Sequence, residues 1–225
     1  MNIDKAFVFS ILICLVTMEM AFDGHLSDDT KPQEALKRIV GNIGNGKADV
    51  ESALILALDN ARLPGGIVRG PDLDNEIERE SASQMTIEGL LNNIVSVTPR
   101  YRWVVDYGVI NLVPAFNEPA MLSFIVTKFD ADDLASLDDA RNRLLEMPDL
   151  QKRSAELHLN TGLEIRVGGV RPPGSPRDSF SVHCRNKTLR ETLNIMVRAQ
   201  GRGVWEYRET HWDKHHGFSI TFPIQ

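Results

Sequence analysis

The sequence predicts an α+β protein of two related small modules, each a short sheet with two helices packed on one face, joined by an extra strand and helix. Two observations carry this prediction. Segments with the helical spacing of apolar residues alternate with short strand-like segments, and part of this pattern occurs twice, 102 positions apart. With 225 residues, of which 42% are hydrophobic, the chain is long enough to bury a sizeable core.

A pattern in the middle of the chain recurs near its end. Placing Trp103 over Trp205 aligns residues 53–105 with residues 155–207 without a gap. Eleven of the 53 aligned positions are identical, where composition alone would give about three. The identical pairs are Ala53/Ala155, Gly66/Gly168, Val68/Val170, Arg69/Arg171, Pro71/Pro173, Thr86/Thr188, Leu91/Leu193, Asn92/Asn194, Val95/Val197, Arg100/Arg202 and Trp103/Trp205. An internal duplication accounts for this match and predicts two modules with the same fold.

Each copy contains an amphipathic helix that is followed by a tryptophan-bearing strand. One face of each helix is apolar at the spacing of successive helical turns. The apolar positions are Ile87, Leu90, Leu91, Ile94 and Val95 in the first copy, and Leu189, Leu193, Met196 and Val197 in the second. Thr86 and Thr188 are the expected N-caps, and Glu191 lies where it completes a capping box with Thr188. We expect Trp103 and Trp205 to be buried against these helices.

The other elements of each copy follow from local patterns of apolar and polar residues. A strand, a turn and a second strand follow each amphipathic helix, and a shorter helix and two strands precede it. The expected elements, first copy then second, are helices 53–60 and 150–159, strands 67–69 and 170–171, strands 77–81 and 180–184, and hairpins 103–113 and 204–222. Each module is therefore expected to run α-β-β-α-β-β.

A further strand and helix are expected between the two copies. Residues 122–129 have the pattern of a strand, and a helix over residues 137–146 begins behind the cap Ser136 and ends before Pro148. Another helix is expected near the start, behind Pro32. The chain then divides into four segments: a leader over residues 1–22, a first module over 30–114, a connecting strand and helix over 115–149, and a second module over 150–225.

The first residues form a leader that differs from the rest of the chain. The apolar run over residues 6–16 is too short to span a membrane comfortably and has the length of a secretory signal core. We therefore expect export, with an uncleaved amphipathic or membrane-tethering helix as the alternative. If the leader is removed, Cys184 is the only cysteine left, so the mature chain can form no internal disulfide.

The charge of the chain limits its partners. A formal net charge of −6 and a sequence pI near 5.5 disfavour nucleic acids and anionic lipid surfaces, which attract basic faces. We expect no nucleic-acid partner, and contact with a membrane only through a possible N-terminal anchor.

The duplicated unit resembles a known bacterial module. A helix that opens with Thr-Leu-x-x-x-Leu, followed by a strand bearing Trp or Tyr, a turn and a closing strand, is similar to the secretin and TonB short N-terminal domain. The residues that carry this resemblance are 86–113 and 188–220, with the preceding strand 180–184. The resemblance implies an exported, noncatalytic α/β module of the cell envelope that passes signals or docks partner proteins.

A histidine-rich loop is the candidate metal site. His211, His215 and His216 lie within six residues of one another, beside Asp213. Neutral imidazole binds zinc, copper and nickel, so the loop can be a metal site. It lacks the helical His-Glu-x-x-His spacing of a hydrolytic zinc site, and a solvated polar loop is the alternative.

Two equivalent arginines are the candidate binding surface. Arg69 and Arg171 occupy the same position in the two copies, and exposed arginine is frequent where interfaces are strongest. The sequence offers no arrangement for nucleophilic catalysis, because His158 and Cys184 lack a Cys-His context and no serine elbow is present.

These observations predict an exported envelope binding or interaction protein that needs no cofactor. Its partner is expected to be another envelope protein. One alternative is a metal-dependent enzyme or metal-binding protein that uses the loop from His211 to His216. Another is a structural protein that pairs through exposed strand edges.

Overall fold

The computed structural model describes residues 31–161, 179–212 and 215–224. The elements below belong to the compact unit of residues 32–225, apart from Lys31. The leader over residues 1–22 and the candidate Arg171 lie outside the described residues. In the described part of the chain, no helix has both the length and the apolar character that a membrane span requires.

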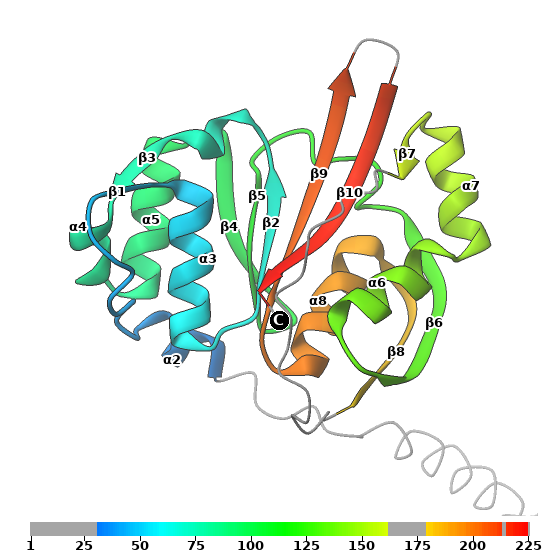
Figure 1. Cartoon of the computed structure of the whole chain (residues 1–225), viewed down its shortest axis with the longest axis horizontal. Coiled ribbons are helices and arrows are strands. Elements are labelled where there is room, and N and C mark those ends of the chain that lie inside the picture. Colours follow the sequence, from blue (N-terminus) through cyan, green and yellow to red (C-terminus); the bar gives the residue numbers. More distant parts are fainter. Residues whose placement is uncertain (1–30, 162–178, 213–214, 225) are drawn as a thin grey trace, which may run out of the picture. The chain divides into compact units, whose positions relative to one another are not determined.

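The protein is α+β, as the sequence predicts, and its first half forms one βαββαββ unit (Figure 1). It begins with the short helix α2 (Lys31–Leu36), and α4 (Arg79–Ser83) and the 3-10 turn η1 (Pro71–Asp74) are small additions. The unit itself consists of β1 (Lys47–Asp49), α3 (Val50–Ala61), β2 (Gly65–Arg69), β3 (Glu76–Glu78), α5 (Ile87–Val97), β4 (Tyr101–Asp106) and β5 (Val109–Pro114).

The second half has the same order of elements, with one extra helix, α7 (Pro148–Glu156). Its elements are β6 (Ile125–Leu134), α6 (Leu137–Leu145), β7 (Asn160–Thr161), β8 (Phe180–Thr188), α8 (Leu189–Gln200), β9 (Val204–Trp212) and β10 (His215–Ile224). The segment expected to connect the modules therefore contributes β6 and α6, which pack within this half: β6 pairs with β8, and α6 contacts α8 and β10.

The strand pairings of the two halves correspond one to one. An antiparallel ribbon joins β1 to β3 in the first half and β6 to β8 in the second. The hairpins β4–β5 and β9–β10 are antiparallel, and the strands β2 and β7 each add to them in parallel. Each half thus has a two-stranded ribbon and a three-stranded sheet.

A parallel pairing between β2 and β9 joins the two three-stranded sheets into one six-stranded sheet, in the order β4-β5-β2-β9-β10-β7 (Figure 1). The register runs from Gly65 opposite Val204 to Arg69 opposite Arg208. Strand β9 is the counterpart of β4, so β2 of the first half occupies the outer edge of the second half's sheet.

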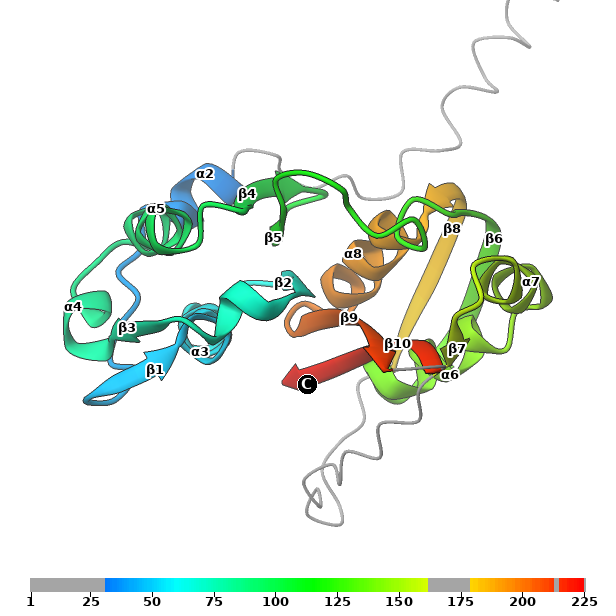
Figure 2. The same ribbon diagram turned by 90° about the horizontal axis from the view of Figure 1, so that it is seen from above.

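Helices α3 and α5 lie on one side of this sheet and α8 on the other (Figure 2), and the two hydrophobic cores lie on these opposite faces. Alternate residues of a strand point to opposite faces. In β5, Ile110 and Leu112 belong to the core of α3 and α5, whereas Val109 and Val113 belong to the core of α6 and α8. The sheet is therefore buried on both sides.

The capping signals in the sequence act as predicted. The Thr86 hydroxyl accepts from the backbone N–H of Gly89, and Ser136 accepts from Asp139. Thr188 and Glu191 form the complete capping box of α8. Met147 is the N-cap of α7, which begins at Pro148, so the proline both ends one helix and starts the next.

Candidate functional site

The joint between β2 and β9 fits a glycine against a tryptophan. Gly66 lies opposite Trp205 in the register, and a Cβ atom on Gly66 would overlap the indole ring. The Trp205 side chain is fully buried, and its Nε1–H donates to Oδ1 of Asn194 on α8 at 2.8 Å. Only glycine lets the neighbouring backbone approach the ring this closely.

The first half repeats this tryptophan arrangement without the neighbouring strand. Trp103 Nε1–H donates to Oδ1 of Asn92 on α5 at 3.0 Å, across the same separation of eleven residues. Trp103 is only partly buried, whereas Trp205 is fully buried as expected. The difference arises because β4, unlike β9, lies at the end of the sheet.

The outer edge of β4 is the candidate functional site. Among the described strands, β5 alone pairs with β4, so its second edge carries no strand partner. Two residues of β4 are exposed, Arg102 and Val105, the latter by 37%. In β9 the counterpart residues from Val204 to Tyr207 are all buried. An exposed edge with a half-covered aromatic ring is a template for adding another strand.

Arg69, one of the two candidate binding residues, lies in an ion network across the joint. Its Nε atom is 3.0 Å from Oε2 of Glu51 on α3, and its Nη1 atom is 3.4 Å from Oε1 of Glu206 on β9. The Glu206 side chain is 3% exposed, and its other oxygen accepts from Thr221. Burial opposes the charge of Arg69, but Glu51 and Glu206 outweigh it and raise the pKa of Arg69.

A second polar cluster fixes α8 to the turn between β4 and β5. Tyr107 has a left-handed backbone conformation in this turn, and its hydroxyl donates to Glu191 at 3.0 Å and contacts Lys187. Arg198 donates to the Tyr107 carbonyl at 3.2 Å. The hydrogen bond that Lys187 donates to the Tyr107 hydroxyl favours the charged ammonium and is the main cause of a raised Lys187 pKa. This cluster tethers the two halves a second time.

The histidine-rich segment forms the end of the β9–β10 hairpin. His211 lies directly opposite His216, and their Nδ1 atoms are 2.7 Å apart. Oε2 of Glu209 is 3.7 Å from Nε2 of His211. Asp213 and the side chain of His215 lie outside the described residues. In the described ranges, no group of three or more His, Cys, Asp or Glu side chains is arranged around a common metal position.

Another histidine lies between two aspartates on the β6–β8 ribbon. His183 Nδ1 is 3.3 Å from Oδ1 of Asp130, and His183 Nε2 is 3.2 Å from Oδ1 of Asp132. Hydrogen bonds from Lys128, and then from His183, lower the pKa of Asp130. Both ring nitrogens of His183 thus face carboxylate acceptors.

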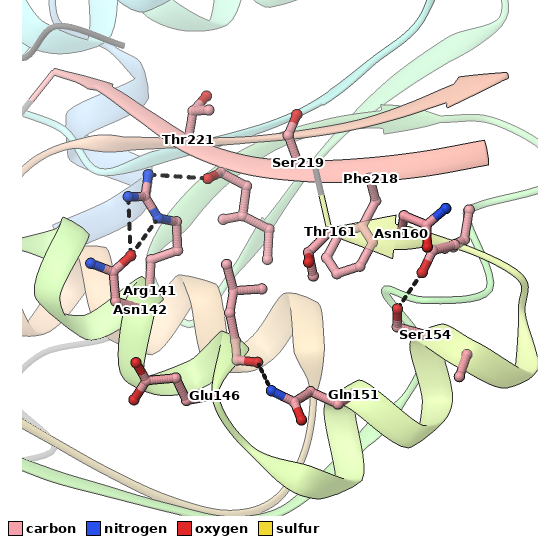
Figure 3. A pocket seen from close by; sticks show the side chains of 14 residues that line it. Arg141, Asn142, Glu146, Gln151, Ser154, Asn160, Thr161, Phe218, Ser219 and Thr221 are labelled. Carbon is pink, nitrogen blue, oxygen red and sulfur yellow. Dashed lines mark hydrogen bonds between the residues drawn. The ribbon is translucent and has the colours of Figure 1, made fainter. Parts of the chain in front are cut away.

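A pocket of about 480 Å³ lies beside β10 in the second half (Figure 3). Side chains from α6, α7, β7 and β10 line it. In Figure 3, Arg141 points along the pocket wall to the Ile220 carbonyl, to which it donates at 3.4 Å. Arg141 also forms an ion pair with Asp138 at 2.8 Å, so this cation is already neutralised by the protein.

The pocket lies along a stretch of β10. The counterpart of this stretch in the first half, on β5, pairs with β2. The hairpin registers make Ile220 and Thr221 the counterparts of Ile110 and Asn111. Ile110 and Asn111 pair with β2, whereas β7 pairs with Gly217 and Phe218 of β10. The chain leaves the described residues at Thr161, which itself lines the pocket.

The buried cysteine lies beside a threonine hydroxyl. Cys184 Sγ is 3.7 Å from the Thr192 hydroxyl, and burial raises the pKa of its thiol. A thiol with a raised pKa is a poor nucleophile.

Several residues of these sites were not singled out from the sequence. Glu209 follows from strand alternation, which places residues 207, 209 and 211 on one face, once β9 is known to extend to Trp212. Asn92 and Asn194 are identical across the aligned copies, but their bond to the tryptophan requires the packing of helix on strand. The role of Glu206 could be recognised only once β2 was known to pair with β9, and no local sequence pattern encodes that pairing.

Comparisons with known proteins give no relative. A scan against models of protein families, a search of curated proteins and a search of solved structures each find no match for this chain.

Proposed function

We propose that this chain is an exported, envelope-associated interaction protein that binds an extended segment of a partner protein along the outer edge of β4. The observation that carries the proposal is the contrast between two counterpart strands. The β9 edge is covered by β2, and the β4 edge is not covered by any described strand. The internal joint is thus an example of how this module accepts a strand.

The internal joint also specifies the chemistry of the partner. Strand β2 has the sequence Gly-Gly-Ile-Val-Arg and runs parallel to β9, with Gly66 against Trp205. By analogy, the partner supplies an extended segment that runs parallel to β4, with a small residue against Trp103 and apolar residues beside it. Backbone hydrogen bonds supply affinity in such strand addition, and the small residue supplies specificity.

A binding role without catalysis is supported by the polar side chains, several of which form contacts between the two halves. Arg69, Glu206 and Glu191 hold the two halves together, and Cys184 is buried with a raised thiol pKa. The acidic net charge disfavours nucleic acids as partners. The apolar leader and the resemblance to the secretin and TonB short N-terminal domain support export, with any membrane contact made through the N-terminal segment.

Site-specific photo-crosslinking tests this function. A photoreactive amino acid replaces the exposed Val105, and the protein is irradiated in envelope extracts. A matched variant carries the same group at Glu88, which is exposed on α5. We expect a discrete crosslinked partner at position 105 that is absent at position 88, and that Trp103→Glu abolishes. Mass spectrometry should locate the crosslink in a short extended segment of that partner.

Two outcomes would change the conclusion. Equal crosslinking at both positions, or none at position 105, contradicts docking at the β4 edge. Crosslinks between two copies of the chain would instead favour a structural protein that pairs through its own strand edges.

A further inference from the structure

The β9–β10 hairpin is longer than its counterpart in the first half. The β4–β5 hairpin closes after the pair Asp106 and Val109, whose counterparts are Arg208 and Ser219. The second hairpin continues for four more residue pairs, which include Glu209 opposite Phe218 and His211 opposite His216. The first half has the same strand pairings without this extension, so the fold of the module does not account for the histidine pair.

The Nδ1 atoms of the two imidazoles face each other at hydrogen-bonding distance. These atoms are 2.7 Å apart, and the ring planes are inclined by 59°. Two nitrogens bound to one tetrahedral zinc ion lie about 3.3 Å apart, since each Zn–N bond is about 2.0 Å. Small rotations of the two side chains would widen this gap to the metal-ligand distance, and both residues are exposed.

Glu209 places a carboxylate close to the far side of the His211 ring. Its Oε2 atom is 3.7 Å from His211 Nε2, which is longer than a hydrogen bond, and the nearby negative charge favours the tautomer with the proton on Nε2, whose Nδ1 lone pair faces His216. The other oxygen of Glu209 accepts from the Tyr207 hydroxyl at 2.6 Å. Histidine ligands commonly donate their second ring N–H to such a carboxylate, which is itself hydrogen-bonded.

We propose that His211 and His216 bind one divalent transition-metal ion of the zinc, copper or nickel class through their Nδ1 atoms. Glu209 is the positioning residue of this site. Imidazole ligands suit these three ions. The described residues supply two nitrogens, so water completes the coordination sphere and leaves positions that a bound partner can take. The site is distinct from the strand edge at β4 and does not depend on the function proposed for that edge.

His183 provides a matched contrast within the same chain. It is exposed like His211, but both of its ring nitrogens lie within 3.3 Å of a carboxylate oxygen of Asp130 or Asp132. Carboxylate oxygens thus occupy the approach to both ring nitrogens, so a metal ion would have to displace one of them. His183→Ala is therefore the control for a general loss of surface histidine.

Titration of the folded protein with Zn²⁺ and with Cu²⁺ tests the site. Calorimetry should give one ion per chain, and the Cu²⁺ electron paramagnetic resonance spectrum should carry the coupling of two imidazole nitrogens. His211→Ala and His216→Ala should each abolish saturable binding, and Glu209→Gln should weaken it about tenfold. His183→Ala should leave affinity and spectrum unchanged. Circular dichroism of each variant checks that the exposed hairpin still folds.

Two results would overturn the proposal. One is the absence of stoichiometric binding by the unsubstituted protein. The other is binding that survives His216→Ala, or that is lost with His183→Ala, since either would locate the ion elsewhere.

Discussion

Gly66 lies against the indole ring of Trp205, at the point where a strand of the first half adds to the sheet of the second. This contact explains why residue 66 is a glycine and why Trp205 is completely buried. It also defines what is lacking at Trp103, which has the same asparagine partner but no strand beside it.

The substitution Gly66→Ala should destabilise the protein by about 2 kcal/mol, since overpacking a filled interior costs roughly 1–3 kcal/mol. The added methyl group would overlap the Trp205 ring. Urea denaturation followed by circular dichroism measures the loss. The double variant Gly66→Ala/Trp205→Leu should lose less stability than the sum of the two single variants, because the smaller side chain makes room for the methyl group. Strictly additive effects would mean that the two residues do not touch.

The two tryptophans should differ in their contribution to stability. Trp205→Ala should lower the free energy of unfolding by about 4 kcal/mol, as for other fully buried aromatic residues. Trp103→Ala should cost about 1–2 kcal/mol, because part of its ring remains in water. The same denaturation experiment compares both variants. Equal losses would contradict the difference in burial on which the candidate site rests.

Removing Arg69 should take a cation away from the carboxylates of Glu51 and Glu206. We expect Arg69→Met to destabilise the fold by about 3 kcal/mol, because breaking a buried ion pair from one side costs roughly this much. Glu206 is 3% exposed and within 3.4 Å of Arg69, so it bears most of the penalty. The double variant Arg69→Met/Glu206→Met should recover part of the stability. A loss as large as the sum of the two single losses would contradict this assignment.

Glu191 should make stability depend on pH in the acidic range. Burial opposes its ionisation, but hydrogen bonds from the Thr188 backbone and from Tyr107 outweigh this and lower its pKa below the ordinary 4.5. Its contribution is therefore fully present above pH 4.5 and is lost as the pH falls through the lower folded-state pKa. Between pH 7 and pH 3, the free energy of unfolding measured by denaturation should fall less in Glu191→Gln than in the parent protein.

The matched control for this experiment is Glu88→Gln. Glu88 is exposed in the first turn of α5, the counterpart helix, but does not occupy the N3 position of its cap. This variant should keep the pH dependence of the parent protein. If it reduces the dependence as much as Glu191→Gln does, the capping box is not its source.

The sequence predicted the elements that have strong local signals. The caps Thr86, Ser136 and Thr188 and the apolar faces behind them define helices within one or two residues. The strand β1 was not predicted, because three residues carry too little periodicity to distinguish a strand. Strand β6 was expected to begin at residue 122 but begins at Ile125, after a turn.

The sites depended on pairings between residues distant in sequence. The aligned copies suggested that residues 69, 103 and 205 matter, but not that β2 pairs with β9 or that Arg69 reaches Glu206. Likewise, clustering in sequence indicated His211 and His216, whereas their direct opposition depends on the hairpin register. Register and strand order are tertiary properties, and a single sequence does not encode them locally.

Residue-resolved amide hydrogen exchange of the isolated protein tests the central claim most directly. The account predicts that amides over residues 204–208 of β9 are protected along the whole strand, whereas alternate amides over residues 102–106 of β4, which point away from β5, exchange rapidly. Those β4 amides should become protected when the crosslinked partner segment is added. Uniform protection of both strands in the isolated protein would contradict an open edge at β4.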